Sequence, residues 1–210
     1  MKERYVEFNP TALQHVAGKA IGQDWCSRVK KIAEGGFNKV FLLTADDGHE
    51  VIARIPTPIA GPPHYTTASE VATIDFLRTV LGLPVPKILD YSTSPENSVG
   101  TEYIIMERVD GESLGSRWLS LTTDEVKHVM AQIAEMEQRI ISFQFPAYGS
   151  LYHERDLNDE SQIALQVEDF SIGPIAGRQF WHSERHRMKL DRGPCESSIC
   201  SARTELTFIT

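Results

Sequence analysis

Cysteine is scarce in this chain, and its three cysteines lack the spacing of a metal site or a disulfide framework. Cys26, Cys195 and Cys200 are odd in number, and the two nearer the C-terminal end have no matching His or Cys neighbours. We therefore expect reduced thiols, as in an intracellular protein, and no metal bound through cysteine.

Long apolar runs and basic clusters are scarce as well. No stretch approaches the roughly 18 apolar residues of a membrane helix, and the N-terminus lacks the features of a signal peptide or an Arg-rich transit peptide. A net charge of −8 disfavours a nucleic-acid partner, because Lys and Arg cluster only at 185–189. The default expectation is a cytoplasmic chain with no membrane span and no nucleic-acid partner.

The residues that are present suit a mainly globular α+β chain. Of the 210 residues, 41% are hydrophobic and 24% are charged, which supplies a core and argues against wholesale disorder. Patterning predicts a helix over 10–21 and another beginning at Thr67. Strands are predicted over 28–32, 39–44, 50–55, 87–91 and 101–107, with Asp46-Asp47-Gly48 as a hairpin turn.

A long amphipathic helix is predicted over 123–143, with Thr122 and Glu125 as its capping box. Its apolar stripe needs a partner surface and consists of Val126, Val129, Met130, Ile133, Met136 and Ile140. Beyond Pro146 we expect irregular structure, and from Gly193 onward a poorly ordered tail.

Several segments together resemble the aminoglycoside phosphotransferase and choline kinase superfamily, which has a protein-kinase-like fold. The matching segments are Glu34-Gly35-Gly36-Phe37-Asn38-Lys39-Val40, Val51-Ile52-Ala53-Arg54, Glu70, Pro84-Val85-Pro86 and Tyr103-Ile104-Ile105-Met106-Glu107. Three further segments look like a fungal branch that includes altered inheritance of mitochondria protein 9: Phe170 to Pro174, Phe180-Trp181 and Leu190 to Pro194. The resemblance covers roughly residues 4 to 194.

The resemblance implies a division of the chain and a function. It implies an N-terminal helical extension (1–27), a kinase-like N-lobe with a five-stranded, mainly antiparallel sheet and one helix (28–110), the start of a helical C-lobe with a linker (111–192), and a divergent tail (193–210). A complete family member would bind ATP with magnesium between its lobes and phosphorylate a small hydroxylated molecule. Residence in the mitochondrion is implied by the resemblance alone.

The resemblance also assigns phosphate-binding roles. Gly35 and Gly36 would let the amides of Gly36, Phe37 and Asn38 face a phosphate; the alternative is a hairpin turn without a ligand. Arg54 stands where the family usually has Lys; the alternative is an ordinary cation at a strand end. Glu70 would pair with Arg54, although Thr67 and Glu70 also have the spacing of a capping box.

Three further residues would contact the base. Met106 would lie behind adenine, and the Glu107 carbonyl and Val109 amide would face its edge; the alternative is a simple strand end. Neither a catalytic residue nor a metal ligand is assigned in this chain, which we expect to stop before the catalytic loop and to be inactive. A changed reading frame, a retained intron or a premature end would account for the tail.

Two segments imitate the missing catalytic motifs. His153 to Asp156 has one residue too many between His and Asp, with Ser161 where the family has Asn, and Asp169-Phe170-Ser171 resembles a metal-binding triplet only superficially. An active kinase using Asp156 remains one alternative. Another is a non-catalytic module that docks a partner through helix 123–143.

Overall fold

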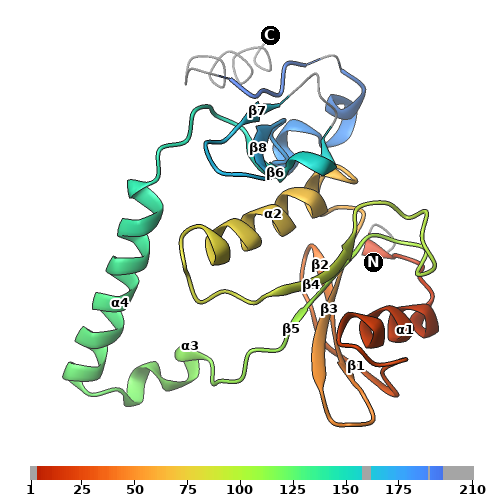
Figure 1. The fold of residues 1–210 in the computed structure, drawn as a ribbon, viewed down its shortest axis with the longest axis vertical. Coiled ribbons are helices and arrows are strands. Elements are labelled where there is room, and N and C mark those ends of the chain that lie inside the picture. Colours follow the sequence, from red (N-terminus) through yellow and green to blue (C-terminus); the bar gives the residue numbers. More distant parts are fainter. Residues whose placement is uncertain (1–3, 158–161, 189, 196–210) are drawn as a thin grey trace.

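The computed structural model describes residues 4–157, 162–188 and 190–195 (Figure 1). Five strands form the first sheet: β1 (Arg28–Glu34), β2 (Asn38–Thr44), β3 (Glu50–Pro56), β4 (Ile88–Ser92) and β5 (Tyr103–Glu107). Their order is β1-β2-β3-β5-β4, and every neighbouring pair is antiparallel. The α+β class and the five-stranded antiparallel sheet expected from the sequence are confirmed.

The hairpin between β2 and β3 forms as its turn residues predict. The Ala45 amide donates to the His49 carbonyl at 2.8 Å, and Gly48 has a φ of 91°. Since this φ favours glycine over residues with a side chain, Gly48 fixes the position of the turn and the register of the two strands.

The two faces of the first sheet are covered by different helices. On β3, Val51, Ala53 and Ile55 are buried in a core that includes Leu13 and Ala17 of α1 (Pro10–Ala20). The intervening side chains point to the opposite face, where α2 (Tyr65–Thr79) packs. Because side chains alternate along a strand, Arg54 belongs to the α2 face.

The loop after α1 crosses the helix backbone closely at Gly18. A Cβ atom on this residue would lie less than 3.0 Å from three backbone atoms of Trp25. The Cys26 amide, which donates to the Gln14 carbonyl at 3.0 Å, holds the loop in place. Only glycine therefore allows the loop to lie against this turn of the helix.

We expect Gly18→Ala to lower the free energy of unfolding by about 1–3 kcal/mol, because the added methyl group must displace the Trp25 backbone. Urea denaturation measures the change. Gly115→Ala is the matched control, since a Cβ there meets only the Ser113 hydroxyl at 3.6 Å. Equal stabilities for the Gly18→Ala variant and the unmodified chain would contradict the close approach.

Helix α2 lies between the first sheet and a second sheet (Figure 1). The second sheet contains β6 (Ser150–His153), β7 (Ile163–Ala164) and β8 (Phe170–Gly173) in the order β6-β8-β7. The prediction of irregular structure beyond Pro146 was therefore wrong. These strands have two to four residues, too few for a recognisable alternation, and buried contacts with α2 stabilise them.

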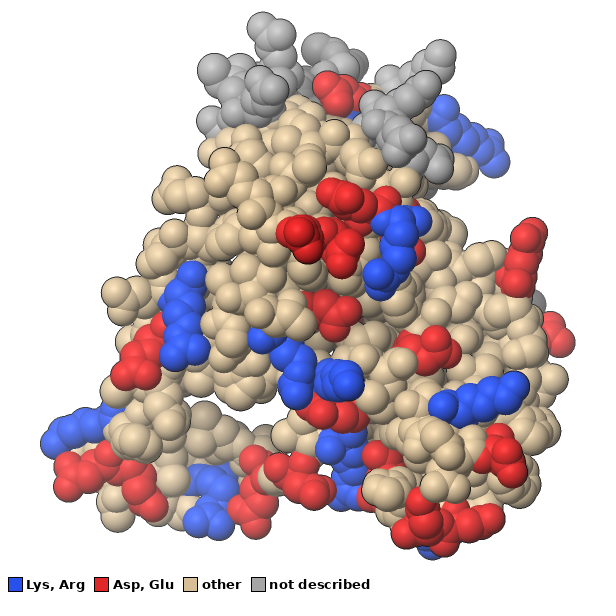
Figure 2. Space-filling model, viewed as in Figure 1, with Lys and Arg blue, Asp and Glu red and all other residues tan. Residues whose placement is uncertain are grey.

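Helix α4 (Thr123–Ser142) follows α3 (Leu114–Arg117) and stands away from the sheets. Its predicted capping box is present: the Glu125 amide donates to Thr122 Oγ1 at 3.3 Å, and Glu125 Oε2 accepts from the Thr122 amide at 2.7 Å. No α4 residue is buried, and Figure 2 shows open space between its lower part and the body of the molecule. The described residues therefore cover the apolar stripe only in part, with Ile140 at its C-terminal end lining a cavity together with Phe76 and Leu81.

The remaining elements are 3₁₀ helices at Trp118–Ser120, Glu154–Asp156, Arg178–Phe180 and Ser183–Arg187. None of the helices in the described ranges has the length and apolar character needed to cross a bilayer. Of the predicted tail, Cys195 pairs with Tyr148 as an isolated bridge, whereas 196–210 lie outside the described residues.

Candidate functional site

The glycine turn, residues 35–37, is anchored to the end of β3. Thr57 is buried, and its amide and hydroxyl donate to the Phe37 carbonyl at 2.8 and 3.2 Å. Within the described part of the chain, the amides of Gly36 and Phe37 have no acceptor. Space is open above both glycines, so two amides are available to an anion.

Arg54 forms an ion pair with Glu70 of α2, through Arg54 Nη1 and Glu70 Oε1. Arg54 lies opposite Val40 in β2 and opposite Ile104 in β5. Its side chain is 27% exposed and that of Glu70 is 26% exposed, so the pair is partly open to a ligand. The predicted pairing is present, and the alternative of an ordinary surface cation is wrong.

The alternative role for Glu70 as a helix cap is also wrong. Helix α2 begins at Tyr65, two residues before the predicted Thr67, and its N-cap residue is His64. Glu102 caps this end of the helix instead. Its carboxylate accepts a hydrogen bond from the His64 amide at 2.8 Å and another from the Thr67 hydroxyl. Glu102 comes from a distant part of the chain, so local spacing gave no signal for it.

The environment of Glu70 changes its titration. Burial raises the pKa of the Glu70 carboxyl above its usual 4.5, while the Arg54 charge acts in the opposite direction. A raised folded-state pKa means that the folded chain holds this proton more tightly than the unfolded chain does. The resulting stabilisation is present below about pH 4.5 and is lost as the pH rises through the folded-state pKa.

Glutamine does not titrate, so we expect Glu70→Gln to lack this pH-dependent loss of stability. As the pH rises above about 4.5, the free energy of unfolding of the unmodified chain should therefore fall relative to that of the variant. Urea unfolding from about pH 3 to about pH 8 measures the difference. Glu125→Gln is the opposite-sign control, because hydrogen bonds from Thr122 lower the pKa of Glu125. Parallel pH profiles for the Glu70→Gln variant and the unmodified chain would contradict the prediction.

The residues expected near a base lie at the end of β5. Met106 is buried against Val71 and Ile104, opposite Ile52 on β3. The Glu107 amide donates to the Lys87 carbonyl at 2.9 Å, and the Glu107 carboxylate pairs with Arg78 at 3.1 Å, a contact the sequence did not suggest. Val109 is 61% exposed, beyond the strand. The structure brings Met106 onto the Arg54 face, but the base-binding roles stay a prediction.

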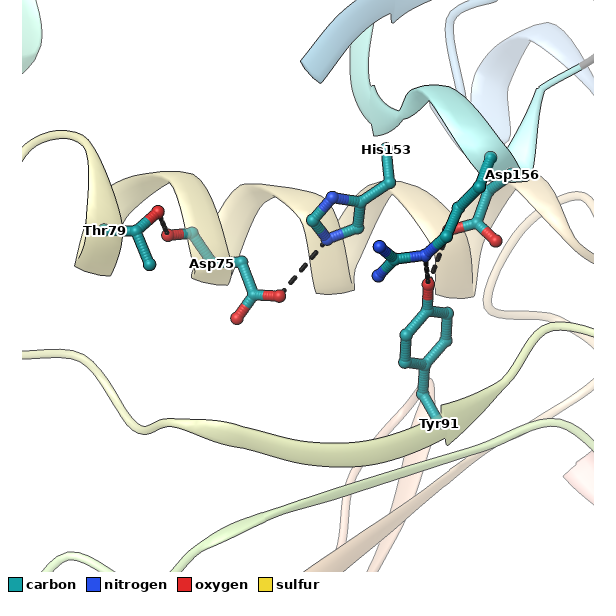
Figure 3. Close-up of polar contacts among 6 residues, drawn as sticks. Asp75, Thr79, Tyr91, His153 and Asp156 are labelled. Atoms are coloured by element: carbon teal, nitrogen blue, oxygen red, sulfur yellow. Dashed lines mark hydrogen bonds and ion pairs between the residues drawn. The ribbon is translucent and has the colours of Figure 1, made fainter. Parts of the chain in front are cut away.

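Asp156 takes part in contacts that join the second sheet to the first (Figure 3). Its carboxylate accepts the Tyr91 hydroxyl at 2.8 Å, and its carbonyl contacts His64 Nε2 at 2.7 Å. Burial and the Asp156 hydrogen bond raise the pKa of Tyr91 to about 12. Nearby, His153 Nε2 lies 3.2 Å from Asp75 Oδ2 of α2. Asp156 thus makes structural contacts between the two sheets.

Asp169 likewise has a structural contact, since its carbonyl accepts the Glu154 amide at 3.0 Å just before β8. Among residues 4–157, 162–188 and 190–195, no group of three or more His, Cys, Asp or Glu side chains is arranged to hold a metal ion.

Comparison with known proteins gives a family match over most of the chain. The model of the family described as "Phosphotransferase enzyme family" matches residues 28–191. A subtelomeric hrmA-associated cluster protein of Aspergillus fumigatus is 68% identical over 179 residues, covering 85% of this chain and 35% of the relative. Altered inheritance of mitochondria protein 9, mitochondrial, of Debaryomyces hansenii is 31% identical over 188 residues, covering 80% and 30%. The chain thus spans about a third of the length of these relatives.

Solved structures give a weaker match. The crystal structure of aminoglycoside phosphotransferase APH(4)-Ia has a TM-score of 0.45 at 18% identity, covering 68% of this chain and 42% of the other. The GDP and kanamycin complex of APH(2")-IIia has a TM-score of 0.42 at 19% identity, covering 57% and 37%.

Proposed function

The chain belongs to the phosphotransferase enzyme family, and from this membership we propose that it binds ATP on the α2 face of its first sheet. The observation that carries the proposal is the partly exposed Arg54–Glu70 ion pair on that face, with the glycine turn anchored at the end of β3. Amides without acceptors and a guanidinium are the groups that bind phosphate oxygens. Met106, Glu107 and Val109 would meet the base.

The residues near Arg54 suit a phosphate group better than they suit a magnesium ion. The Gly36 and Phe37 amides and Arg54 fit a nucleotide phosphate, because all three supply donors that the described residues leave wholly or partly available. The described residues offer no corresponding cluster of carboxylates for magnesium. We assign the phosphate-binding groups to this chain and derive no step through a metal.

A thermal melt with and without magnesium ATP tests the binding. ATP at about 100 times its dissociation constant adds about 2.7 kcal/mol to the free energy of unfolding, which gives a measurable rise in melting temperature. Adenosine without phosphates is the control and is expected to give a much smaller rise, because it lacks the groups that Arg54 and the glycine turn would contact. A cooperative melt that ATP leaves unchanged would refute the proposal.

We further propose that residues 1–210 on their own do not transfer phosphate to an acceptor. Family chemistry needs an Asp that orients the acceptor hydroxyl, and the hydrogen bond from Tyr91 to Asp156 supports a structural role for that carboxylate. The acceptor of a longer chain would be a small hydroxylated molecule. ATP turnover that disappears in Asp156→Asn, which keeps a hydrogen-bond acceptor for Tyr91, would overturn this part of the proposal.

A second candidate function is that of a non-catalytic module that docks a partner through α4. It is favoured by the absence of buried residues on α4 and by the exposure of Met130 and Ile141. Sedimentation analysis distinguishes the two functions: a defined assembly that Met130→Glu dissociates, with no response to ATP, would support the module.

Two cellular compartments are candidates for this chain, the mitochondrion and the cytoplasm. The name of the Debaryomyces relative includes the word mitochondrial, whereas the cytoplasm is the default expectation for this chain. Imaging of a C-terminally tagged chain against a mitochondrial marker decides between them.

A further inference from the structure

A cavity of about 420 Å³, here called the ring pocket, lies between the loop 58–63 and the segment 178–186. The loop joins β3 to α2 and contributes Pro58, Pro62 and Pro63, and α2 contributes Tyr65. The opposite segment contributes Arg178, Trp181, His182 and His186. The volume lies within the range of about 300–1,000 Å³ that is typical of small-molecule sites.

Tyr65 and Trp181 supply the aromatic part of the ring-pocket lining. Their ring centroids are 5.3 Å apart with an interplanar angle of 30°. The Trp181 indole N–H donates to the Ile175 carbonyl at 2.7 Å, and the Arg192 guanidinium lies 4.0 Å from the centre of its ring. Because these contacts hold Trp181 in place without a ligand, the aromatic part of the lining is formed before a ring-bearing ligand binds.

Two arginines lie near the ring pocket, and they differ in their partners. Arg192 is hydrogen-bonded to backbone carbonyls, whereas Arg178 lines the cavity. Arg192 donates to the Phe180 carbonyl at 3.2 Å and to the Arg185 carbonyl at 2.5 Å. Arg178 lies 5.8 Å from the centre of the Phe37 ring, beside the glycine turn, and forms no ion pair with any described residue. Its guanidinium therefore has donors to offer an anion.

The charge of the ring pocket contrasts with that of the whole chain. The chain carries a net charge of −8, yet the described residues that line the pocket include Arg178 and two histidines and no Asp or Glu. Among these lining residues, an acidic ligand would meet cationic donors and no carboxylate.

We propose that the ring pocket binds a small molecule that carries an anionic group on a flat ring. The ring lies against Tyr65 and Trp181, and the carboxylate or phosphate meets the Arg178 guanidinium. This site is separate from the proposed ATP site, because neither Arg54 nor Glu70 lines it. Arg178 lines the pocket and its guanidinium lies 5.8 Å from the centre of the Phe37 ring, so the occupied pocket would border the glycine turn.

The test is an NMR titration of the Trp181 indole N–H, assigned through its loss in Trp181→Phe. Phenyl phosphate and benzoate are the probes that combine a ring with an anion, and inorganic phosphate and benzyl alcohol each carry one feature alone. At least one of the first two is expected to shift the Trp181 signal saturably and to bind about tenfold more tightly than either of the others. The tighter of the first two identifies the anion.

Three variants complete the experiment. Arg178→Gln is expected to weaken binding of the better probe about tenfold, whereas Arg117→Gln removes an exposed cation from α3, which does not line the pocket, and leaves binding unchanged. Arg54→Ala also leaves it unchanged, which separates this site from the nucleotide site. The proposal is overturned if neither probe shifts Trp181, if a folded Arg178→Gln variant binds equally well, or if Arg54→Ala abolishes the shift.

Discussion

The Arg54→Ala variant is expected to lose half or more of the rise in melting temperature that magnesium ATP, at about 100 times its dissociation constant, gives the unmodified chain. A hydrogen bond to a charged group contributes about 1.5–3 kcal/mol, so removal of the guanidinium lowers the affinity for ATP about 10- to 100-fold. Glu70 also loses its partner and becomes an uncompensated carboxylate beside the proposed phosphate site. Both changes act in the same direction, and the melting temperature as a function of ATP concentration measures their sum.

Two control variants separate binding from general stability. Arg54→Lys keeps a cation and introduces the residue that the family usually has, so it should keep most of the rise. Arg117→Ala removes a cation that pairs with Glu112 at 3.0 Å on the exposed α3, and the rise should be unchanged. An ATP response of Arg54→Ala equal to that of the unmodified chain would place the phosphates elsewhere.

The second large effect is expected at Phe76, which joins α2 to the second sheet. Phe76 is buried, and its ring centroid lies 4.8 Å from that of Phe143 and 5.4 Å from that of Phe170. Phe76→Ala should lower the free energy of unfolding by about 3–5 kcal/mol, because it removes these contacts and leaves a cavity in the core. Urea denaturation followed by circular dichroism measures the loss.

Phe37→Ala is the matched control for Phe76→Ala. The Phe37 ring is 48% exposed, so its removal should change the free energy of unfolding by no more than about 0.5 kcal/mol. A loss below about 1 kcal/mol in Phe76→Ala would mean that the second sheet does not depend on α2 for its stability.

The first sheet was predictable from the sequence because its signals are local. Gly48 marks a turn, β2 and β3 have seven residues each, and alternation along β3 separates the two faces. The second sheet gave no such signal. Strand β7 has two residues, and pairing of Ile163 with Ile172 depends on tertiary contacts that no local pattern encodes.

The candidate site likewise contains one contact that the sequence predicts and others that it does not. The Arg54–Glu70 pair was predictable from the sequence because the family resemblance implies a cation on the third strand and an acid on the next helix. Glu102, which caps α2, lies 38 positions from His64, and His153 lies 78 positions from Asp75. Such pairs depend on the folded arrangement, so spacing along the chain does not reveal them.

The position of α2 between two sheets makes it a mechanical link. Glu70 holds the first sheet through Arg54, and six residues later Phe76 holds the second sheet. A helix rises about 1.5 Å per residue, so the two attachment points are about 9 Å apart along a stiff rod. Any displacement of the second sheet would be transmitted along this rod to the Glu70 carboxylate. Substitutions in β8 would thus change the distance between the Glu70 carboxylate and the Arg54 guanidinium without replacing either residue.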